Sequence, residues 1–304
     1  DAYGETLRDL GKTNNNIVVL DADLSKSTKT EVFAKQFPER HFNAGIAEQN
    51  MMSVAAGLAA AGKLPFVSTF AMFATGRAYE QVRNSVCYPG LNVKIAATHA
   101  GLTVGEDGAT HQAIEDIALM RVLPNMTVVV PADAAEARAA VLWAADYKGP
   151  VYLRLGRSGV EDIFTDDYCF EHGKAVELVQ GTDLTIIACG IMVGPARAAA
   201  MELAKEGISA RVLNIHTVKP IDRMAIVKAA KETGAIVTCE EHLLAGGLGS
   251  AVAEVVVTEA PVPMEMIGVR DTFGESGTPA ALLEKHGLTT PDIIKAAKKV
   301  LNNK

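Results

Sequence analysis

Short runs of β-branched and other apolar residues alternate with longer segments of helical periodicity along most of this chain. That alternation is typical of βαβ units, in which parallel strands form a sheet and helices cover its faces. In the first half, the sequence predicts strands at Ile17–Asp21, Pro65–Thr69, Val93–Thr98, Met126–Val130 and Val151–Arg154. The helices predicted between them are Ile46–Ala61, Ala71–Cys87 and Ala134–Ala145.

The pattern is interrupted between residues 157 and 173, where Ser, Gly, Asp, Thr and Tyr gather around Asp166 and Asp167. A second series follows, with predicted strands at Leu184–Cys189, Ala210–Leu213, Ala235–Cys239 and Met264–Ile267. Its predicted helices lie near residues 195–206, 222–232, 248–258, 279–286 and 291–301. We therefore expect two doubly wound α/β domains, at residues 1–160 and 173–304, joined by a linker at residues 161–172.

The composition limits the classes of protein to which the chain can belong. Apolar residues make up 49% and charged residues 21%, which excludes a disordered chain or a coiled coil. The formal net charge of −7 argues against non-specific binding to nucleic acid or to an anionic membrane. The cysteines show no CxxC spacing, and no apolar run reaches the ~18 residues of a membrane span. We expect a soluble, cytoplasmic protein.

In doubly wound folds, binding sites form beyond the carboxyl ends of the strands, so the residues that follow each strand are the first candidates. Asp23 and Ser27 follow the first strand, where they could bind a ligand or simply cap a helix. Glu48 begins an apolar helix, where it could favour the helix dipole or exchange a proton with a ligand nitrogen. Phe70 and Phe73 follow the second strand as core residues or as a platform for a flat ring.

The densest polar segment follows the third predicted strand and runs from His99 to Gln112. Its glycines lead us to expect a loop that is mobile or closely approached by a ligand. His99, Asp107 and His111 could be metal ligands, but no Cys or regularly spaced third His completes such a set. Arg157, beyond the last strand of the first series, is either a surface charge or a bidentate contact for phosphate or carboxylate.

Two motifs in the second half have simple structural interpretations. The run Gly246-Gly247-Leu248-Gly249 resembles a phosphate loop, but it lacks the full spacing and an acidic partner, so we expect an ordinary helix start. Glu240, Glu241 and His242 could hold a metal, although a polar strand end is the simpler interpretation.

Taken together and in order along the chain, these segments resemble the carboxyl-terminal half of transketolase, from Ala2-Tyr3-Gly4 to the end. The specific parts are Gly45-Ile46-Ala47-Glu48-Gln49-Asn50, Ser68-Thr69-Phe70-Ala71-Met72-Phe73, Gly105-Glu106-Asp107-Gly108-Ala109-Thr110-His111-Gln112 and Arg157. The resemblance implies a pyrimidine-binding domain followed by a smaller C-terminal domain. It also implies a reaction of the pentose phosphate pathway, in which a two-carbon ketol unit passes from a ketose phosphate to an aldose phosphate with thiamine diphosphate as cofactor.

The resemblance further implies which residues contact the cofactor. Glu48 is the acid that hydrogen-bonds N1′ of the aminopyrimidine and promotes its imino tautomer. Phe73 stacks on the pyrimidine, Phe70 lines the same pocket, and Asp23 lies near the thiazolium. Apolar neighbours such as Met51 would keep the carboxyl of Glu48 protonated near neutrality.

The substrate-binding residues implied by the resemblance follow other strands of the same predicted sheet. His99 and Arg157, with Ser27, hold the phosphate of the sugar. Asp107 contacts a sugar hydroxyl, and His111 lies beside the reacting carbon and handles its proton. Glu48, His111 and His99 are thus the expected catalytic residues.

Transketolase usually begins with a diphosphate-binding domain whose Gly-Asp-Gly and downstream Asn hold the metal, and this chain has no such motif. The resemblance therefore implies a split enzyme, in which a partner subunit equivalent to the amino-terminal half binds the diphosphate and Mg²⁺ or Ca²⁺. We expect no metal ligand in this chain and an assembly with two copies of each chain. Asp1 stands where family members place an Arg, unless that Arg precedes it.

Three alternatives stay open at this point. A 1-deoxy-xylulose-5-phosphate synthase shares the Glu-Gln and Asp-Gly-x-Thr-His features, but it tends to have Arg in place of His99. The β subunit of a 2-oxo-acid dehydrogenase lacks the set of His99, Asp107 and His111. A non-catalytic interaction subunit that retained only the fold would be expected to have lost some of these residues.

Overall fold

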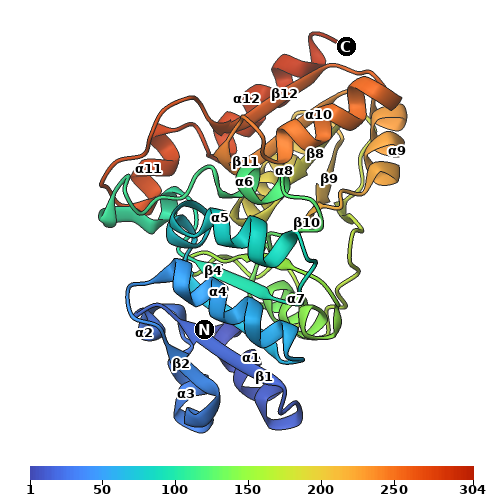
Figure 1. The fold of residues 1–304 in the computed structure, drawn as a ribbon. Coiled ribbons are helices and arrows are strands. Elements are labelled where there is room, and N and C mark those ends of the chain that lie inside the picture. Colours follow the sequence, from blue (N-terminus) through green and yellow to red (C-terminus); the bar gives the residue numbers. More distant parts are fainter.

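The first half of the chain forms a seven-stranded sheet in the order β10-β5-β6-β4-β3-β1-β2, seen in the computed structural model of residues 1–304 (Figure 1). Its strands are β1 (Ile17–Asp21), β2 (His41–Asn43), β3 (Leu64–Phe70), β4 (Lys94–Thr98), β5 (Thr127–Val129), β6 (Val151–Arg154) and β10 (Thr217–Lys219). All neighbours pair in parallel except β10, which runs antiparallel to β5. The carboxyl ends of the parallel strands therefore meet along one edge of the sheet.

Helices cover both faces of this sheet because successive side chains of a strand point to opposite faces. Ile17 and Val19 of β1 pack in a cluster with α1 (Ala2–Thr13) and α7 (Ala134–Asp146). Val18 and Leu20 pack in another cluster with α4 (Glu48–Ala60). Every residue of β1, β3 and β4 is buried, which explains why apolar residues predominate in these strands.

The second half forms a five-stranded sheet in the order β12-β11-β8-β9-β7, in which only the edge strand β7 is antiparallel. Its strands are β7 (Val176–Val179), β8 (Leu184–Ala188), β9 (Ala210–Asn214), β11 (Ile236–Leu243) and β12 (Met264–Val269). The helices around it are α8 (Val193–Lys205), α9 (Arg223–Thr233), α10 (Leu248–Glu259), α11 (Pro279–Lys285) and α12 (Thr290–Leu301). Two doubly wound α/β sheets confirm the predicted fold class.

The two halves of the chain share a sheet and a core cluster. Strand β10 belongs to the second half by sequence, yet it completes the sheet of the first half beside β5. The largest core cluster also spans both halves, with Val130 from the first and Val252 from the second. The guanidinium of Arg154, at the end of β6, donates to both carboxylate oxygens of Asp116 and to the backbone oxygen of Glu241. These contacts fix the second sheet beside the carboxyl edge of the first.

Most predicted elements are found within a few residues of their expected bounds, but the predicted helix Ala71–Cys87 is not continuous. It consists of a π-helical turn η2 (Phe73–Arg77), the short helix α5 (Tyr79–Gln81) and a second π-helical segment η3 (Val82–Cys87). A π-helical turn accommodates an extra residue by widening the helix, and such turns occur frequently at functional sites. The remaining short elements are α2 (Ser25–Thr28), α3 (Glu31–Gln36), η1 (Pro38–Arg40), η4 (Leu102–Asp107), α6 (Asp116–Arg121) and η5 (Gly190–Met192).

Residues 161–172, predicted as a linker, form no helix or strand but are fixed against the first half. The carboxylate of Asp133 accepts hydrogen bonds from the backbone N–H groups of Ile163 and Phe164, at 2.7 Å each. The domain boundaries themselves stay a prediction.

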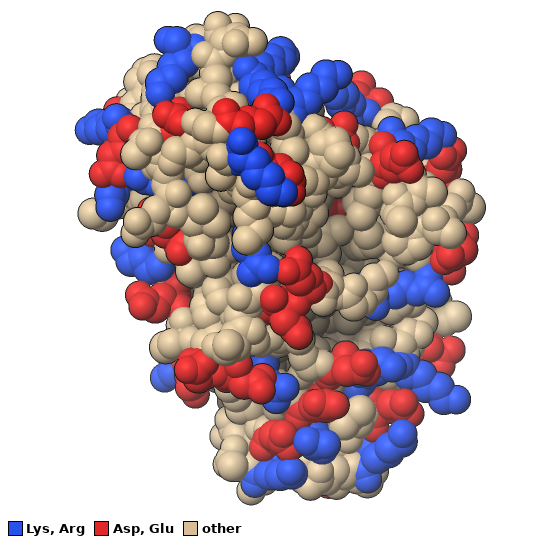
Figure 2. Space-filling view, turned by 180° about the vertical axis from the view of Figure 1, so that it is seen from behind, with Lys and Arg blue, Asp and Glu red and all other residues tan.

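None of the helices is long and apolar enough to cross a membrane. Figure 2 shows Lys and Arg interspersed with Asp and Glu over one face, rather than gathered in a patch of one sign.

Candidate active site

The predicted site residues gather at the carboxyl edge of the seven-stranded sheet. Asp23 follows β1, Phe70 ends β3, His99 follows β4 and Arg157 lies just beyond β6. Because β1, β3, β4 and β6 are successive neighbours in the sheet, residues far apart in sequence reach one edge. Glu48 joins them as the first residue of α4, which follows β2.

Four aromatic rings form one cluster at this edge. The rings of Phe70 and His99 are stacked, with centroids 3.9 Å apart, and Phe73 lies 5.9 Å from Phe70 in a similar orientation. His111 approaches Phe73 edge-on, at 5.4 Å. The structure thus brings together ring residues that were predicted from separate segments of the sequence. Phe73 reaches the cluster as the first residue of the π-helical turn η2.

Glu48 lies beside this cluster and has a cationic partner that the sequence analysis missed. Its side chain is 1% exposed, and its two carboxylate oxygens accept from Nη1 of Arg77 at 3.0 and 2.9 Å. The guanidinium carbon of Arg77 also lies 4.5 Å from the ring centroid of Phe73. The apolar neighbours expected for Glu48 are thus joined by a cation. The spacing of Phe73 and Arg77, four residues apart on a helical segment, was the available signal.

Two predicted site residues have left-handed backbone conformations. Asp23 has φ of 63° and His99 has φ of 57°. Such values are uncommon for residues other than glycine and persist only where the surrounding structure enforces them, often at functional sites. At Asp23, the backbone N–H donates to the side chain of Asn43 at the end of β2, at 3.0 Å.

His99 is a neutral imidazole at neutral pH. Burial lowers its pKa to about 4, and the nearby positive charge of Arg157 acts in the same direction. Its Nδ1 lies 3.0 Å from the hydroxyl of Thr98. A neutral imidazole can offer one N–H to an anion and keeps its other nitrogen as an acceptor.

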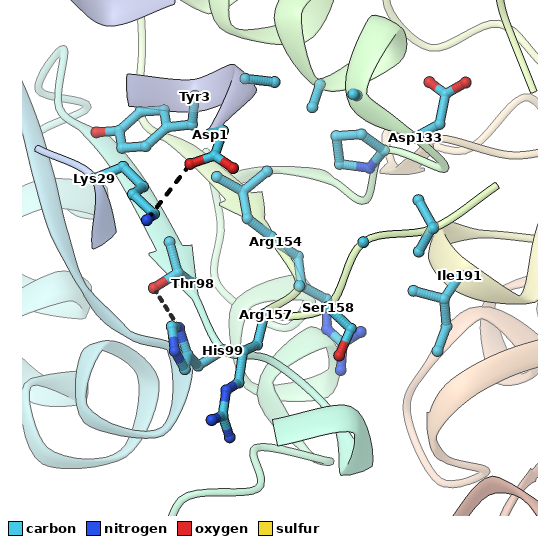
Figure 3. Close-up of a pocket in the computed structure, with 18 of the residues that line it drawn as sticks. Asp1, Tyr3, Lys29, Thr98, His99, Asp133, Arg154, Arg157, Ser158 and Ile191 are labelled. Carbon is cyan, nitrogen blue, oxygen red and sulfur yellow. Dashed lines mark hydrogen bonds and ion pairs between the residues drawn. The ribbon is translucent and has the colours of Figure 1, made fainter. Parts of the chain in front are cut away.

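A cavity of about 420 Å³ opens beside the aromatic cluster and is lined by three of the residues expected to hold a phosphate, Ser27, His99 and Arg157 (Figure 3). Lys29 and Ser158, which the sequence analysis did not nominate, line the same cavity. The cavity therefore collects cationic and hydrogen-bonding groups suited to an anionic ligand.

The charged groups at the mouth of this cavity are partly paired within the chain. Arg157 Nη1 lies 3.6 Å from a carboxylate oxygen of Glu106 and 3.8 Å from one of Asp107. It also donates to the backbone oxygen of Val104. The Nζ of Lys29 lies 3.5 Å from the carboxylate of Asp1. Asp107 is thus placed next to Arg157.

The glycine-rich segment that carries Asp107 and His111 is held by the second half of the chain. Glu241 accepts a hydrogen bond from the backbone N–H of Thr103, at 2.6 Å. A Cβ on Gly101, whose φ is 82°, would overlap the carboxylate of Glu241. This glycine therefore allows a close approach by protein rather than by a ligand, unlike the expectation from sequence.

The remaining motif of the second half is also structural. Glu240 accepts from the backbone N–H groups of Leu248 and Gly249, at 2.6 and 2.8 Å, where α10 begins as predicted. Burial raises the pKa of Glu241 to about 7, with the positive charge of Arg154 acting in the opposite direction. No group of three or more His, Cys, Asp and Glu side chains in the chain is arranged to hold a metal ion.

A buried acid and a cluster of rings thus lie at the carboxyl edge of a doubly wound sheet, the edge at which α/β proteins bind their ligands. Family models match both halves: residues 1–161 match the pyrimidine binding domain of transketolase, and residues 173–293 match the transketolase C-terminal domain. The chain therefore belongs to the transketolase family, as the resemblance predicted.

Within the family, the chain is similar to proteins of nearly its own length. It is 53% identical over 296 residues to a protein of Methanocaldococcus jannaschii described as a transketolase C-terminal section, covering 96% of this chain and 93% of that protein. It is 46% identical over 304 residues to the 6-deoxy-6-sulfo-D-fructose transketolase subunit of a Clostridium species (strain MSTE9), covering 100% and 94%. A solved structure described as a split-gene transketolase, an inactive β4 tetramer, superposes with a TM-score of 0.93 at 62% identity, covering 99% and 97%.

The family implies dependence on thiamine diphosphate. The residues present fit its aminopyrimidine, because a flat group that carries N–H donors already occupies the place between the acid and the ring. That group is the guanidinium of Arg77, which contacts Glu48 and the face of Phe73 at once.

Proposed function

We propose that the chain is the C-terminal subunit of a split, thiamine diphosphate-dependent transketolase. The reaction moves a two-carbon ketol unit from a ketose phosphate to an aldose phosphate in the cytoplasm. One observation carries this proposal: two features lie side by side. The first is the pair of Glu48 and Phe73, and the second is the cavity lined by Ser27, His99 and Arg157. One feature suits a flat nitrogen heterocycle, and the other suits a phosphorylated sugar.

Glu48 acts on the pyrimidine. Its carboxyl, buried at the first residue of α4, holds or moves a proton at N1′ of the aminopyrimidine. Phe73 would stack on the pyrimidine and Phe70 would support it from the strand end, since the two rings lie in similar planes. Asp23 would lie near the thiazolium. Thiamine diphosphate, when bound, supplies the electron sink for the carbon unit that is transferred.

The cavity residues bind and orient the sugar phosphate. Arg157 provides a bidentate cation, neutral His99 provides one N–H, and Ser27 provides a hydroxyl. His111, edge-on to Phe73, handles a proton at the reacting carbon, and Asp107 accepts a hydrogen bond from a sugar hydroxyl. Binding of the phosphate replaces the carboxylates of Glu106 and Asp107 as the partners of Arg157.

The diphosphate and Mg²⁺ or Ca²⁺ are held mainly by a partner subunit that corresponds to the amino-terminal half of transketolase. The similarity of the chain, over nearly its full length, to proteins described as a C-terminal section and a transketolase subunit supports this division. We propose an assembly of two copies of each chain.

Co-expression with a partner that carries Gly-Asp-Gly and a downstream Asn tests the proposal. The purified complex should transfer ketol units between sugar phosphates, and either chain alone should not. Glu48→Gln should lower turnover by about 10²- to 10⁴-fold, the usual contribution of a positioned proton donor, while the complex still assembles. Glu39→Gln is the matched control, because that carboxylate is 68% exposed. Full activity of the isolated chain, or of Glu48→Gln, would overturn the proposal.

A further inference from the structure

Arg77 occupies the position that the proposed function assigns to a cofactor ring. It ends the π-helical turn η2, and its guanidinium donates to both oxygens of Glu48 while it lies 4.5 Å from the centroid of Phe73. A guanidinium is a flat group that stacks on aromatic faces and donates N–H to a carboxylate, and an aminopyrimidine protonated at N1′ can do both as well. The two groups therefore require the same carboxylate and the same ring face.

The ion pair with Arg77 gives the buried carboxylate of Glu48 a hydrogen-bonding partner. The side chain of Glu48 is 1% exposed, and a buried carboxylate without a partner is strongly destabilising. Arg77 provides the partner from a side chain that is 46% exposed, so its guanidinium has a path to solvent. Two contacts hold the guanidinium in place: Glu48 is the only side chain to which Arg77 donates a hydrogen bond, and Phe73 is the ring on which it lies.

We propose that Arg77 is an internal substitute for the aminopyrimidine. In the free chain it pairs with Glu48 and covers Phe73, and it moves toward solvent when a pyrimidine ring enters. This inference rests on the proposed function. Its consequence is that cofactor binding competes with a contact of the chain itself. The apparent affinity of the free chain for the ring is then reduced by the fraction of molecules in which the site is closed.

Thiamine is a suitable probe, because it carries the aminopyrimidine but no diphosphate for a partner subunit to hold. The full chain is titrated with thiamine while NMR follows the Nε–H signal of Arg77 and the ring signals of Phe73. We expect the Arg77 side chain to be ordered before thiamine is added and mobile at saturation. Arg77→Ala should bind thiamine about tenfold more tightly, the factor expected if about a tenth of the chains have an open site.

Two further variants make the result specific. Arg77→Lys keeps the charge and loses the flat group, so its affinity for thiamine should lie between those of the parent and Arg77→Ala. Arg83→Gln removes an exposed cation that bonds only to Asn84, and it should leave the affinity unchanged. An unchanged affinity in Arg77→Ala would overturn the inference, as would an Arg77 signal that does not respond to thiamine.

The experiment also separates failure of this inference from failure of the proposed function. Should thiamine bind with equal affinity to the parent and to Arg77→Ala, and bind poorly to Glu48→Gln, the proposed role of Glu48 stands and the inference about Arg77 is wrong. Should thiamine bind to none of the variants although the ordered Arg77 signal disappears in Glu48→Gln, the ion pair is real. In that case the proposed function fails, and the inference fails with it.

Discussion

Replacing Glu241 with Ala should loosen the loop that carries Asp107 and His111, although residue 241 belongs to the second half of the chain. The Glu241 carboxylate is 2% exposed and accepts the backbone N–H of Thr103 at 2.6 Å. Its other oxygen lies 3.9 Å from Nη1 of Arg154, so the acceptor is held by a buried cation. Removing it leaves the Thr103 amide buried without an acceptor.

The size of the effect follows from that single bond. Because burial raises the pKa of Glu241 to about 7, the measurement belongs above that pH, where the carboxylate is charged. A hydrogen bond to a charged group contributes about 1.5–3 kcal/mol, so local opening at Thr103 should there become roughly 10- to 100-fold more frequent. Hydrogen exchange measured by NMR reports this directly as a loss of protection at the Thr103 amide. The amide of Val67, inside the buried strand β3, is the reference for global stability.

Glu241→Gln is the matched variant, because its amide oxygen can still accept from Thr103 without a charge. It should lose about half as much protection, since charge-assisted bonds are roughly twice as strong as neutral ones. Unchanged protection of Thr103 in Glu241→Ala would refute the reasoning. Equal losses at Thr103 and Val67 would also refute it, because the bond would then support the whole fold rather than the loop.

Two further predictions concern stability. Burial lowers the pKa of His216 to about 4, so the unfolded chain takes up its proton near pH 6.5 while the folded chain does not. The stability from this group is therefore present above pH 6.5 and lost as the pH falls toward 4, at about 1.4 kcal/mol per pH unit. The free energy of unfolding, measured with urea, should therefore fall by about 2 kcal/mol less between pH 6.5 and 5 in His216→Gln than in the parent chain. An equal fall in both would contradict the assignment of this pH dependence to His216. Gly101→Ala should lower the free energy of unfolding by about 1–3 kcal/mol, because φ there is 82° and the new Cβ meets Glu241. In a double-mutant cycle, Glu241→Ala should recover part of that loss, because it removes the side chain that the new Cβ meets. Strictly additive effects of the two mutations would argue against the clash.

The sequence was sufficient for the buried strands and for the edge at which the site lies. β1 and β6 have the predicted bounds, because buried parallel strands are short, mainly apolar runs, and each of these two follows a turn segment, Asn14-Asn15-Asn16 or Gly149-Pro150. Helix α1 was missed although Tyr3 and Leu7 have helical spacing. Its interior glycines argue against a helix, yet a Cβ on Gly11 would lie 2.6 Å from the ring of Phe33, so close packing requires them.

The two contacts that shape the site most could not be derived from local pattern. Glu48 meets Arg77 from 29 positions away, and Glu241 meets Thr103 from 138 positions away. Periodicity and turn chemistry describe neighbours along the chain, so they identify Glu48 as a helix start without identifying its partner. The roles of the individual site residues rest on the resemblance to the family, and the experiments above are what test them.

The position of strand β10 limits where a chain of this kind can be divided into two polypeptides. Its three residues cover the edge of β5, which would otherwise present unpaired N–H and C=O groups to solvent. A break within residues 161–172 would separate β5 from that cover and divide a core cluster that contains both Val130 and Val252. The two family domains of this chain are thus separate units of sequence that share a sheet and a core cluster, and a division between them would expose the edge of β5.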